Sequence, residues 1–430
     1  MGIQMNISHI KTCDFRSLMK NLIPKNSYLT HSIHPYTAKL IPHIPRYFIE
    51  KYTQIGDTIL DPFCGSGTTL LEAKLSGRNA IGIDINPLAV LISEVKTTPL
   101  NPETLSIVIE SLKKKIKNEN KKNIVEFPNI DYWFSKDAQN ELGRIKYVIE
   151  TFNLDKNIYK FLLVCFSSII RKSSYADPRI AKTFRSRRVK EKIEAGWKPM
   201  PIIYFEEVLD KNFEKMRLLW KATHLDNSIV KVFQGDARQT SLILKQNDFK
   251  EVDFVITSPP YINAQDYFRS YKLELWWLGL STPEEVRELN KQAIGTDTVS
   301  GYSYNSPPKV EDKTLNDLLM KIWHKNRKKA YIVYNYFENM KIVFREITAV
   351  LKDNKYFVLV TGCNTICGVK IPTYEILTNI ASTYNFKCVE IVKDEIKNRN
   401  LPPKRNHNGG IIKEEWITVY QKVRGGNNED

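Results

Sequence analysis

The 430-residue sequence has the composition of an ordinary globular protein, with 42% hydrophobic and 26% charged residues. Its longest apolar run, residues 161–170, is far shorter than the roughly 20 residues that cross a bilayer, and the polar N-terminus lacks a signal-peptide core. These features exclude a membrane-spanning class and predict a cytoplasmic protein of two or three domain-sized units. The net charge of +16 indicates a polyanionic partner, most often nucleic acid, although solvated lysines would give the same total.

The first part of the chain alternates strands with helices. Short strands are predicted at 58–60 and 80–83, with a helix at 68–75 between them. The glycine-rich loop DPFCGSG, residues 61–67, follows the first strand, and Asp84 ends the second. This order is the first half of a doubly wound α/β sheet.

The glycine-rich loop indicates a ligand site. Backbone N–H groups gather at the helix N-terminus after Phe63, and Gly65 and Gly67 let a ligand approach the backbone closely. Asp84 can accept hydrogen bonds from two ribose hydroxyls. The loop lacks both the three-glycine spacing of dinucleotide sites and the lysine of Walker loops. Together with Asp61, these residues suit a cofactor that has a ribose and a cationic amino acid end, as S-adenosylmethionine does.

The alternation breaks at residues 101–226, which look helical and basic. Arg185, Arg187 and Arg188 stand close together in the most basic stretch, residues 171–198. Because strand signals resume afterwards, this segment is predicted to be an insertion between the second and third strands of the sheet.

Five further strands are predicted, at 228–236, 252–256, 355–362, 387–392 and 414–422. Helices are predicted at 267–280, 330–351 and 374–384. The polar stretch at 281–314 resembles a mobile loop. The fold class is therefore α/β, with a sheet of about seven strands.

Four motifs, DPFCGSGTT, GIDIN, GDA and TSPPY, together resemble the S-adenosylmethionine-dependent DNA amino-methyltransferases. The resemblance is greatest to the N4-cytosine branch and covers about 30–100 and 228–422. It implies a methyltransferase (Rossmann-like) fold, double-stranded DNA as the substrate, and a restriction-modification system whose endonuclease acts separately. HPYTAKLIP, which includes Thr37, is similar to the segment that lines the methionine end of the cofactor, with an amphipathic helix as the alternative. Asp236 resembles the residue that binds the cofactor adenine, with a helix N-cap as the alternative.

The turn Ser258-Pro259-Pro260-Tyr261 has residues suited to the chemistry that the resemblance implies. An exocyclic base amine is a poor nucleophile because its lone pair is delocalised into the ring. The Ser258 hydroxyl and the Pro259 carbonyl can accept its two N–H hydrogens and favour a pyramidal nitrogen. The prolines stiffen the turn so that these acceptors are aimed in advance. Tyr261 is predicted to stack on a base swung out of the duplex.

The predicted domains are 1–100, the basic insertion 101–226, the second half of the methyltransferase domain at 227–422, and a disordered tail at 423–430. The insertion, with Arg185, Arg187 and Arg188, is the candidate for DNA contact and target recognition. The loop at 281–330 is the rival location, and the basic stretch at 397–410 is a further candidate for phosphate contact.

Three other functions stay open at this point. N6-adenine methylation is the first, although its catalytic turn usually begins with Asp or Asn. RNA guanine-N2 methylation is the second, and a non-enzymatic nucleic-acid-binding module is the third. No metal site is predicted, because the scattered cysteines lack a second ligand pair at metal spacing.

Overall fold

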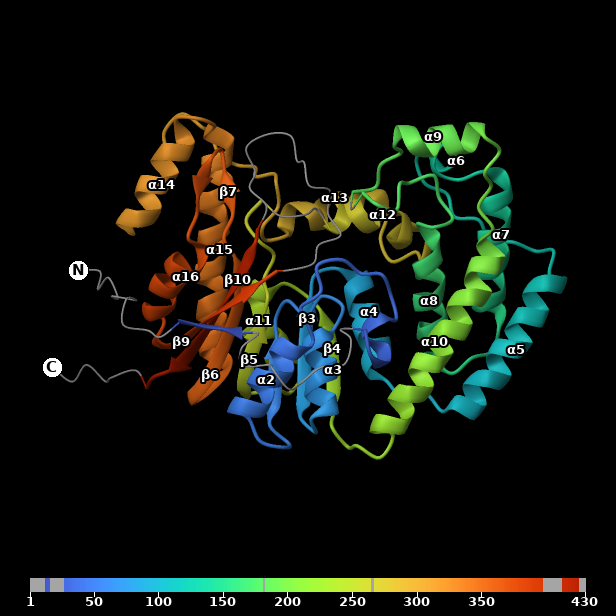
Figure 1. Cartoon of the computed structure of the whole chain (residues 1–430), viewed down its shortest axis with the longest axis horizontal. Coiled ribbons are helices and arrows are strands. Elements are labelled where there is room, and N and C mark those ends of the chain that lie inside the picture. The colour runs from blue at the N-terminus through green and yellow to red at the C-terminus, as the bar shows by residue number, and fades with distance from the viewer. Residues whose placement is uncertain (1–11, 16–26, 181, 264–266, 397–411, 425–430) are drawn as a thin grey trace.

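The computed structural model describes residues 12–15, 27–180, 182–263, 267–396 and 412–424 (Figure 1). Its main sheet has eight strands in the order β1-β9-β10-β6-β5-β2-β3-β4. The strands are β1 (Thr12–Asp14), β2 (Thr58–Asp61), β3 (Asn79–Asp84), β4 (Val230–Gln234), β5 (Val252–Thr257), β6 (Leu351–Gly362), β9 (Phe386–Glu395) and β10 (Glu414–Lys422). Seven of them are the predicted strands, and the three-residue β1 adds an edge strand that the sequence reasoning missed.

Most neighbouring strands run parallel, and β10 alone among the described strands of this sheet pairs antiparallel with both neighbours, β6 and β9. The carboxyl ends of the parallel strands β2, β3, β4 and β5 therefore lie at one edge of the sheet. Ligands bind at this edge in doubly wound folds.

Helices cover both faces of the sheet, as the doubly wound prediction requires (Figure 1). One face packs against α2 (His43–Tyr52) and α3 (Thr68–Leu75). The other face packs against α11 (Thr240–Gln246), α14 (Lys313–Trp323), α15 (Arg327–Val350) and α16 (Thr373–Ser382). Neighbouring residues of β2 show the alternation, because Ile59 joins the first core and Leu60 the second.

The segment between β3 and β4 begins with α4 (Pro87–Thr97) and is otherwise a helical unit with its own core. Its helices are α5 (Pro102–Asn118), α6 (Ile130–Trp133), α7 (Lys136–Thr151), α8 (Lys156–Ile170), α9 (Arg187–Glu194) and α10 (Pro201–Thr223). The helix α12 (Tyr267–Trp277), which comes from the second half of the chain, also packs into this core. Trp277 of α12 lies edge-on to Phe134 and Phe166, with ring centroids 5.7 and 6.3 Å away.

Two local predictions need correction. The stretch 281–314 is not simply a loop, because it contains α13 (Pro283–Gln292). Thr282 and Glu285 form a capping box there, and Pro283 occupies the first helical turn, where it needs no N–H partner. The alternative considered for residues 34–42, an amphipathic helix, is also wrong, since these residues form irregular turns.

The remaining short elements are η2 (Leu29–Ser32), η3 (Ala237–Gln239) and the hairpin of β7 (Thr365–Ile366) and β8 (Val369–Lys370). Among the described residues, no helix has the length and apolar character needed to cross a membrane. The predicted phosphate-contacting stretch at 397–410 and most of the predicted tail lie outside the described residues.

Candidate active site

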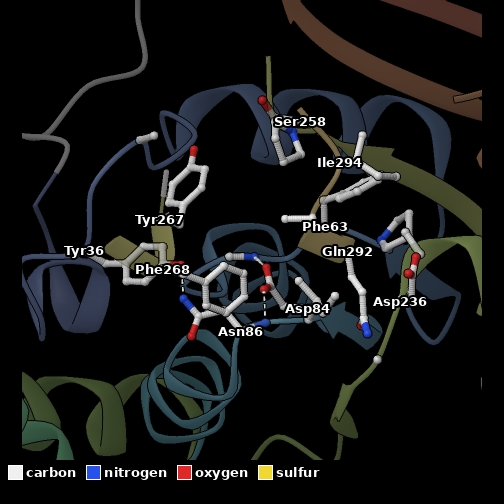
Figure 2. Close-up of a pocket in the computed structure, with 18 residues that line it drawn as sticks. Tyr36, Phe63, Asp84, Asn86, Asp236, Ser258, Tyr267, Phe268, Gln292 and Ile294 are labelled. Atoms are coloured by element: carbon white, nitrogen blue, oxygen red, sulfur yellow. Dashed lines mark hydrogen bonds between the residues drawn. The ribbon is translucent and has the colours of Figure 1, made fainter. Parts of the chain in front are cut away.

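Loops at the carboxyl edge of the sheet surround a pocket (Figure 2). The residues that line it come from the ends of β2, β3, β4 and β5, from the segment before α2, and from α12 and α13. They are Tyr36, Ala38, Pro62, Phe63, Gly65, Asp84, Ile85, Asn86, Gly235, Asp236, Ala237, Ser258, Pro260, Tyr267, Phe268, Gln292, Ala293 and Ile294.

The glycine-rich loop uses its two glycines differently. Gly65 lines the pocket with φ +50°, and a Cβ built there meets no atom within 4 Å, so its backbone is open to a ligand. Gly67 has φ +75°, and a Cβ there would lie 2.9 Å from Ser93 Oγ. Gly67 is not among the residues that line the pocket, and its lack of a side chain is explained by the close approach of α4.

Asp84 sits at the end of β3 and holds the glycine loop in place. Its carboxylate accepts hydrogen bonds from the N–H of Gly65 at 2.9 Å and of Asn86 at 2.8 Å. Burial raises the pKa of Asp84 to about 6, because the charged form loses solvation. Asn86 in turn donates to the Tyr36 hydroxyl at 3.2 Å and caps α4 through its side-chain oxygen (Figure 2).

Asp61 lies behind the pocket rather than on its surface. It is 4% exposed, and its carboxylate accepts hydrogen bonds from Thr257 Oγ1 at 2.6 Å and from the N–H of Phe63 at 3.1 Å. Burial raises its pKa to about 6 as well. Asp61 therefore ties the end of β2 to the end of β5, which leads into the Ser-Pro-Pro-Tyr turn.

Asp236 lines the opposite side of the pocket and caps η3. The N-cap role considered for it is therefore observed, and adenine binding stays a prediction. Its carboxylate binds the Arg238 side chain. Arg238 also donates to Asn339 Oδ1 at 2.6 Å and to the carbonyl of Gln292 at 2.8 Å. This ion pair connects the end of β4 to α15 and to the end of α13.

Only part of the predicted catalytic turn lines the pocket. Ser258 and Pro260 line the pocket, whereas Pro259 is buried (Figure 2). Tyr261 is outside the set of lining residues, and its hydroxyl donates to Glu415 Oε1 of β10 at 2.7 Å. A Cβ at Gly362 would come within 2.9 Å of the Tyr261 ring. Stacking of Tyr261 on a base stays a prediction.

An aromatic wall stands beside Asp84 and was not predicted. Tyr36 stacks on Tyr271 with centroids 4.7 Å apart, and on Tyr267 at 6.4 Å. Thr37 is not among the lining residues; its N–H donates to the Tyr271 hydroxyl at 2.6 Å. Thr37 thus holds Tyr271 against its own neighbour Tyr36.

The three predicted DNA-binding arginines lie in the insertion and are not equivalent. Arg185 is enclosed by rings, 5.2 Å from the Tyr132 centroid and 5.0 Å from that of Tyr175. Arg187 is 93% exposed and pairs with Glu191 at 2.9 Å, while Arg188 is exposed on the same helix, α9. Arg185 is therefore partly a structural residue, whereas Arg187 and Arg188 are available at the surface.

Comparison with known proteins agrees with this arrangement. The N6/N4 methyltransferase model, described as DNA methylase, matches residues 18–95. The chain is 28% identical over 399 residues to the Type II methyltransferase M.MvaI of Kocuria varians, covering 88% of this chain and 86% of that protein. It is 27% identical over 420 residues to the Type II methyltransferase M.BsoBI of Geobacillus stearothermophilus, covering 85% and 80%. These findings support a DNA amino-methyltransferase.

S-adenosylmethionine is the methyl donor of the DNA amino-methyltransferases, and the pocket fits it. A carboxylate, Asp84, and an open glycine backbone, Gly65, stand beside apolar side chains, Phe63 and Ile85. This combination suits a ribose with an adenine ring attached.

Several lining residues of this methyltransferase could not be found by motif. Phe268, Gln292 and Ile294 come from two segments that are distant in sequence from the glycine loop, whereas Tyr36 lies in the predicted HPYTAKLIP segment. Asn86 was the exception, because the run Asp84-Ile85-Asn86-Pro87 predicts an N-cap before a first-turn proline.

Proposed function

We propose that this protein transfers a methyl group from S-adenosylmethionine to the exocyclic N4 amine of cytosine in double-stranded DNA. The observation that carries the proposal is that Ser258 lines the same pocket as Asp84 and Asp236. A methyl donor held by the carboxylates and an amine held by the turn would therefore meet in one cavity.

The proposed cofactor residues divide by chemistry. Asp84 accepts hydrogen bonds from the ribose, and Asp236 and Phe63 hold the adenine. Gly65 and Thr37 shape the methionine side, while Gly67 and Asp61 act from behind by holding the loop. When bound, the cofactor supplies an electrophilic methyl group on a sulfonium.

The proposed role of the turn is to prepare the amine. The Ser258 hydroxyl and the Pro259 carbonyl accept the two N–H hydrogens, which localises the nitrogen lone pair. Pro259 is buried and Pro260 lines the pocket, so the turn is supported from behind before the substrate arrives. Tyr261 secures the far end of the turn through Glu415.

The serine at the first position of the turn favours cytosine N4 over adenine N6 as the acceptor. Adenine N6 is the second candidate, because both amines present the same two N–H hydrogens. The two relatives are both named Type II methyltransferases, which supports a restriction-modification role. A cytoplasmic location and a separately acting endonuclease are part of the proposal.

Transfer of tritium from labelled S-adenosylmethionine to plasmid DNA and to total RNA tests the substrate class. The proposal predicts label in DNA for the parent chain and almost none for Ser258→Ala. Label in RNA with none in DNA would contradict it.

A further inference from the structure

A short segment of the insertion contacts residues that lie close in sequence to those lining the pocket. We call residues 182–186 the rim segment. Thr183 Oγ1 donates to the carbonyl of Arg269 at 2.8 Å, and Arg269 directly follows the pocket-lining Phe268. Lys182 lies 3.5 Å from Asp297, three residues after the pocket-lining Ile294. The rim segment is therefore fixed to both of the elements that close this side of the pocket.

Two buried or partly buried side chains make the rim segment rigid. Asp177 is 1% exposed, its N–H donates to the carbonyl of Phe184 at 2.8 Å, and its carboxylate accepts from Ser186 Oγ at 2.5 Å. Arg171 donates to the carbonyl of Lys182 at 3.3 Å and to that of Ser270 in α12 at 3.2 Å. The backbone of the rim segment is thus held from below, by the insertion and by α12 together.

The side chain of Phe184 is the exception to this packing. Lys182, Thr183, Arg185 and Ser186 each use their side chains in the contacts given above, whereas Phe184 is 55% exposed. It is the one phenylalanine with so open a side chain among the residues the structure describes. Single exposed apolar side chains are common on protein surfaces, so it is the place of Phe184 next to the pocket-lining elements that indicates binding.

The surroundings of Phe184 indicate the chemistry of its partner. The adjoining helix α9 (Figure 1) carries four basic residues, Arg187, Arg188, Lys190 and Lys192, against two acids, Glu191 and Glu194. In a complex with DNA, an aromatic ring can stack on bases while the neighbouring cations contact backbone phosphates. Extrusion of a base also leaves a gap in the duplex next to the pocket that receives it.

We propose that Phe184 enters duplex DNA at the pocket rim and stacks on the bases that the extruded target leaves behind, while α9 contacts the neighbouring phosphates. This inference rests on the proposed function. Phe184 would then favour extrusion of the target base without touching the methyl donor or the amine.

Phe184→Ala tests the inference, using a duplex that carries the site mapped on methylated plasmid DNA. We expect kcat/KM to fall roughly 5- to 100-fold on the fully paired duplex, the range of one lost stacking contact. On a duplex with an abasic site opposite the target, we expect nearly parental activity, because that base is already unpaired. Phe184→Trp should retain activity on both duplexes.

A matched control is Leu225→Ala, which removes another exposed apolar side chain, 83% exposed, beyond the end of α10. It should leave both duplexes unaffected. Equal loss on paired and abasic duplexes for Phe184→Ala, or no loss on either, would overturn the inference. A change in oligomeric state in light scattering would also overturn it, since Phe184 would then contact a protein. If the parent chain methylates neither duplex, the proposed function itself fails.

Discussion

Ser258 is the residue on which the proposed chemistry depends most. It lines the pocket, and none of the hydrogen bonds described above for Asp84 and Asp236 involves it. We therefore expect Ser258→Ala to slow methyl transfer by about 10²-fold or more, the scale for one aimed hydrogen-bond partner, with cofactor binding nearly intact. Single-turnover transfer and calorimetry measure the two quantities separately. Abolished cofactor binding in a folded variant would assign Ser258 to the cofactor site instead.

Asp84 should show the reverse pattern. Asp84→Ala is expected to weaken cofactor binding by about 1–3 kcal/mol, the scale for hydrogen bonds to a charged group. Unchanged affinity in calorimetry would remove Asp84 from the site.

The raised pKa of Asp84, about 6, gives this site a pH dependence. The charged carboxylate is the better acceptor, so cofactor affinity in the parent chain should fall as the pH is lowered from 7 to 5. The stability of the free protein should change in the opposite direction. Since the folded pKa exceeds the ordinary value, the folded chain binds more protons between about pH 4 and 6, and this carboxyl destabilises the fold as pH rises through 6.

Affinity and thermal unfolding measured across this pH range check both signs. Asp84→Ala should flatten the affinity profile, leaving the part due to Asp61, whose pKa is also about 6. A profile that keeps its full slope in the variant would assign the titration to another group.

Tyr261 and Glu415 form a pair 154 residues apart in sequence. If Glu415 positions the turn through the Tyr261 hydroxyl, Tyr261→Phe and Glu415→Ala should each lower kcat more than they change KM, and the double variant should be little worse than either. We expect a coupling energy of about 1–3 kcal/mol. Glu415→Gln, which keeps an acceptor, should recover much of the rate. Additive losses would show that the two residues act independently.

The residues that the sequence could identify are those whose roles are local. Gly65, Asp84 and Ser258 were predicted because each lies at or just after the end of a strand within a short motif, and all three line the pocket. The partnership of Tyr261 with Glu415 could not be predicted, because it depends on the position of β10 in the sheet.

At the scale of elements, the strands were predictable because buried parallel strands read as short apolar runs between turn residues. The helix α13 was missed although Thr282-Pro283-Glu284-Glu285 is a strong helix start. The helix was missed because it has few apolar residues, of which only Val286 is buried.

The exposed arginines of helix α9 are predicted to contribute to DNA affinity. Replacing Arg187 and Arg188 together by Ala should make the slope of log affinity against log salt shallower by about 0.9 per lost phosphate contact. Arg185 is left intact because its contacts with Tyr132 and Tyr175 support the fold. Arg217→Ala on α10, a half-exposed arginine paired with Glu214, is the control and should not change the slope. If the double variant binds DNA like the parent across the salt series, α9 is a solvated surface.

At the scale of the whole molecule, the insertion and the catalytic half form one packed body. Trp277 of α12 is buried in the core of the insertion, and the same helix brings Tyr267 and Phe268 to the pocket. The sequence predicts two separate parts because the 101–226 segment interrupts the strand pattern. It could not show that α12 joins them, since helix–helix contacts between distant segments leave no local signal.

The identity of the modified nucleoside tests the central claim most directly. DNA methylated by the parent chain is digested to nucleosides and analysed by mass spectrometry beside authentic standards. The account predicts N4-methylcytosine, lost in Ser258→Ala. N6-methyladenine as the product would contradict the assignment to cytosine, and the absence of any methylated nucleoside from DNA would contradict the proposed function.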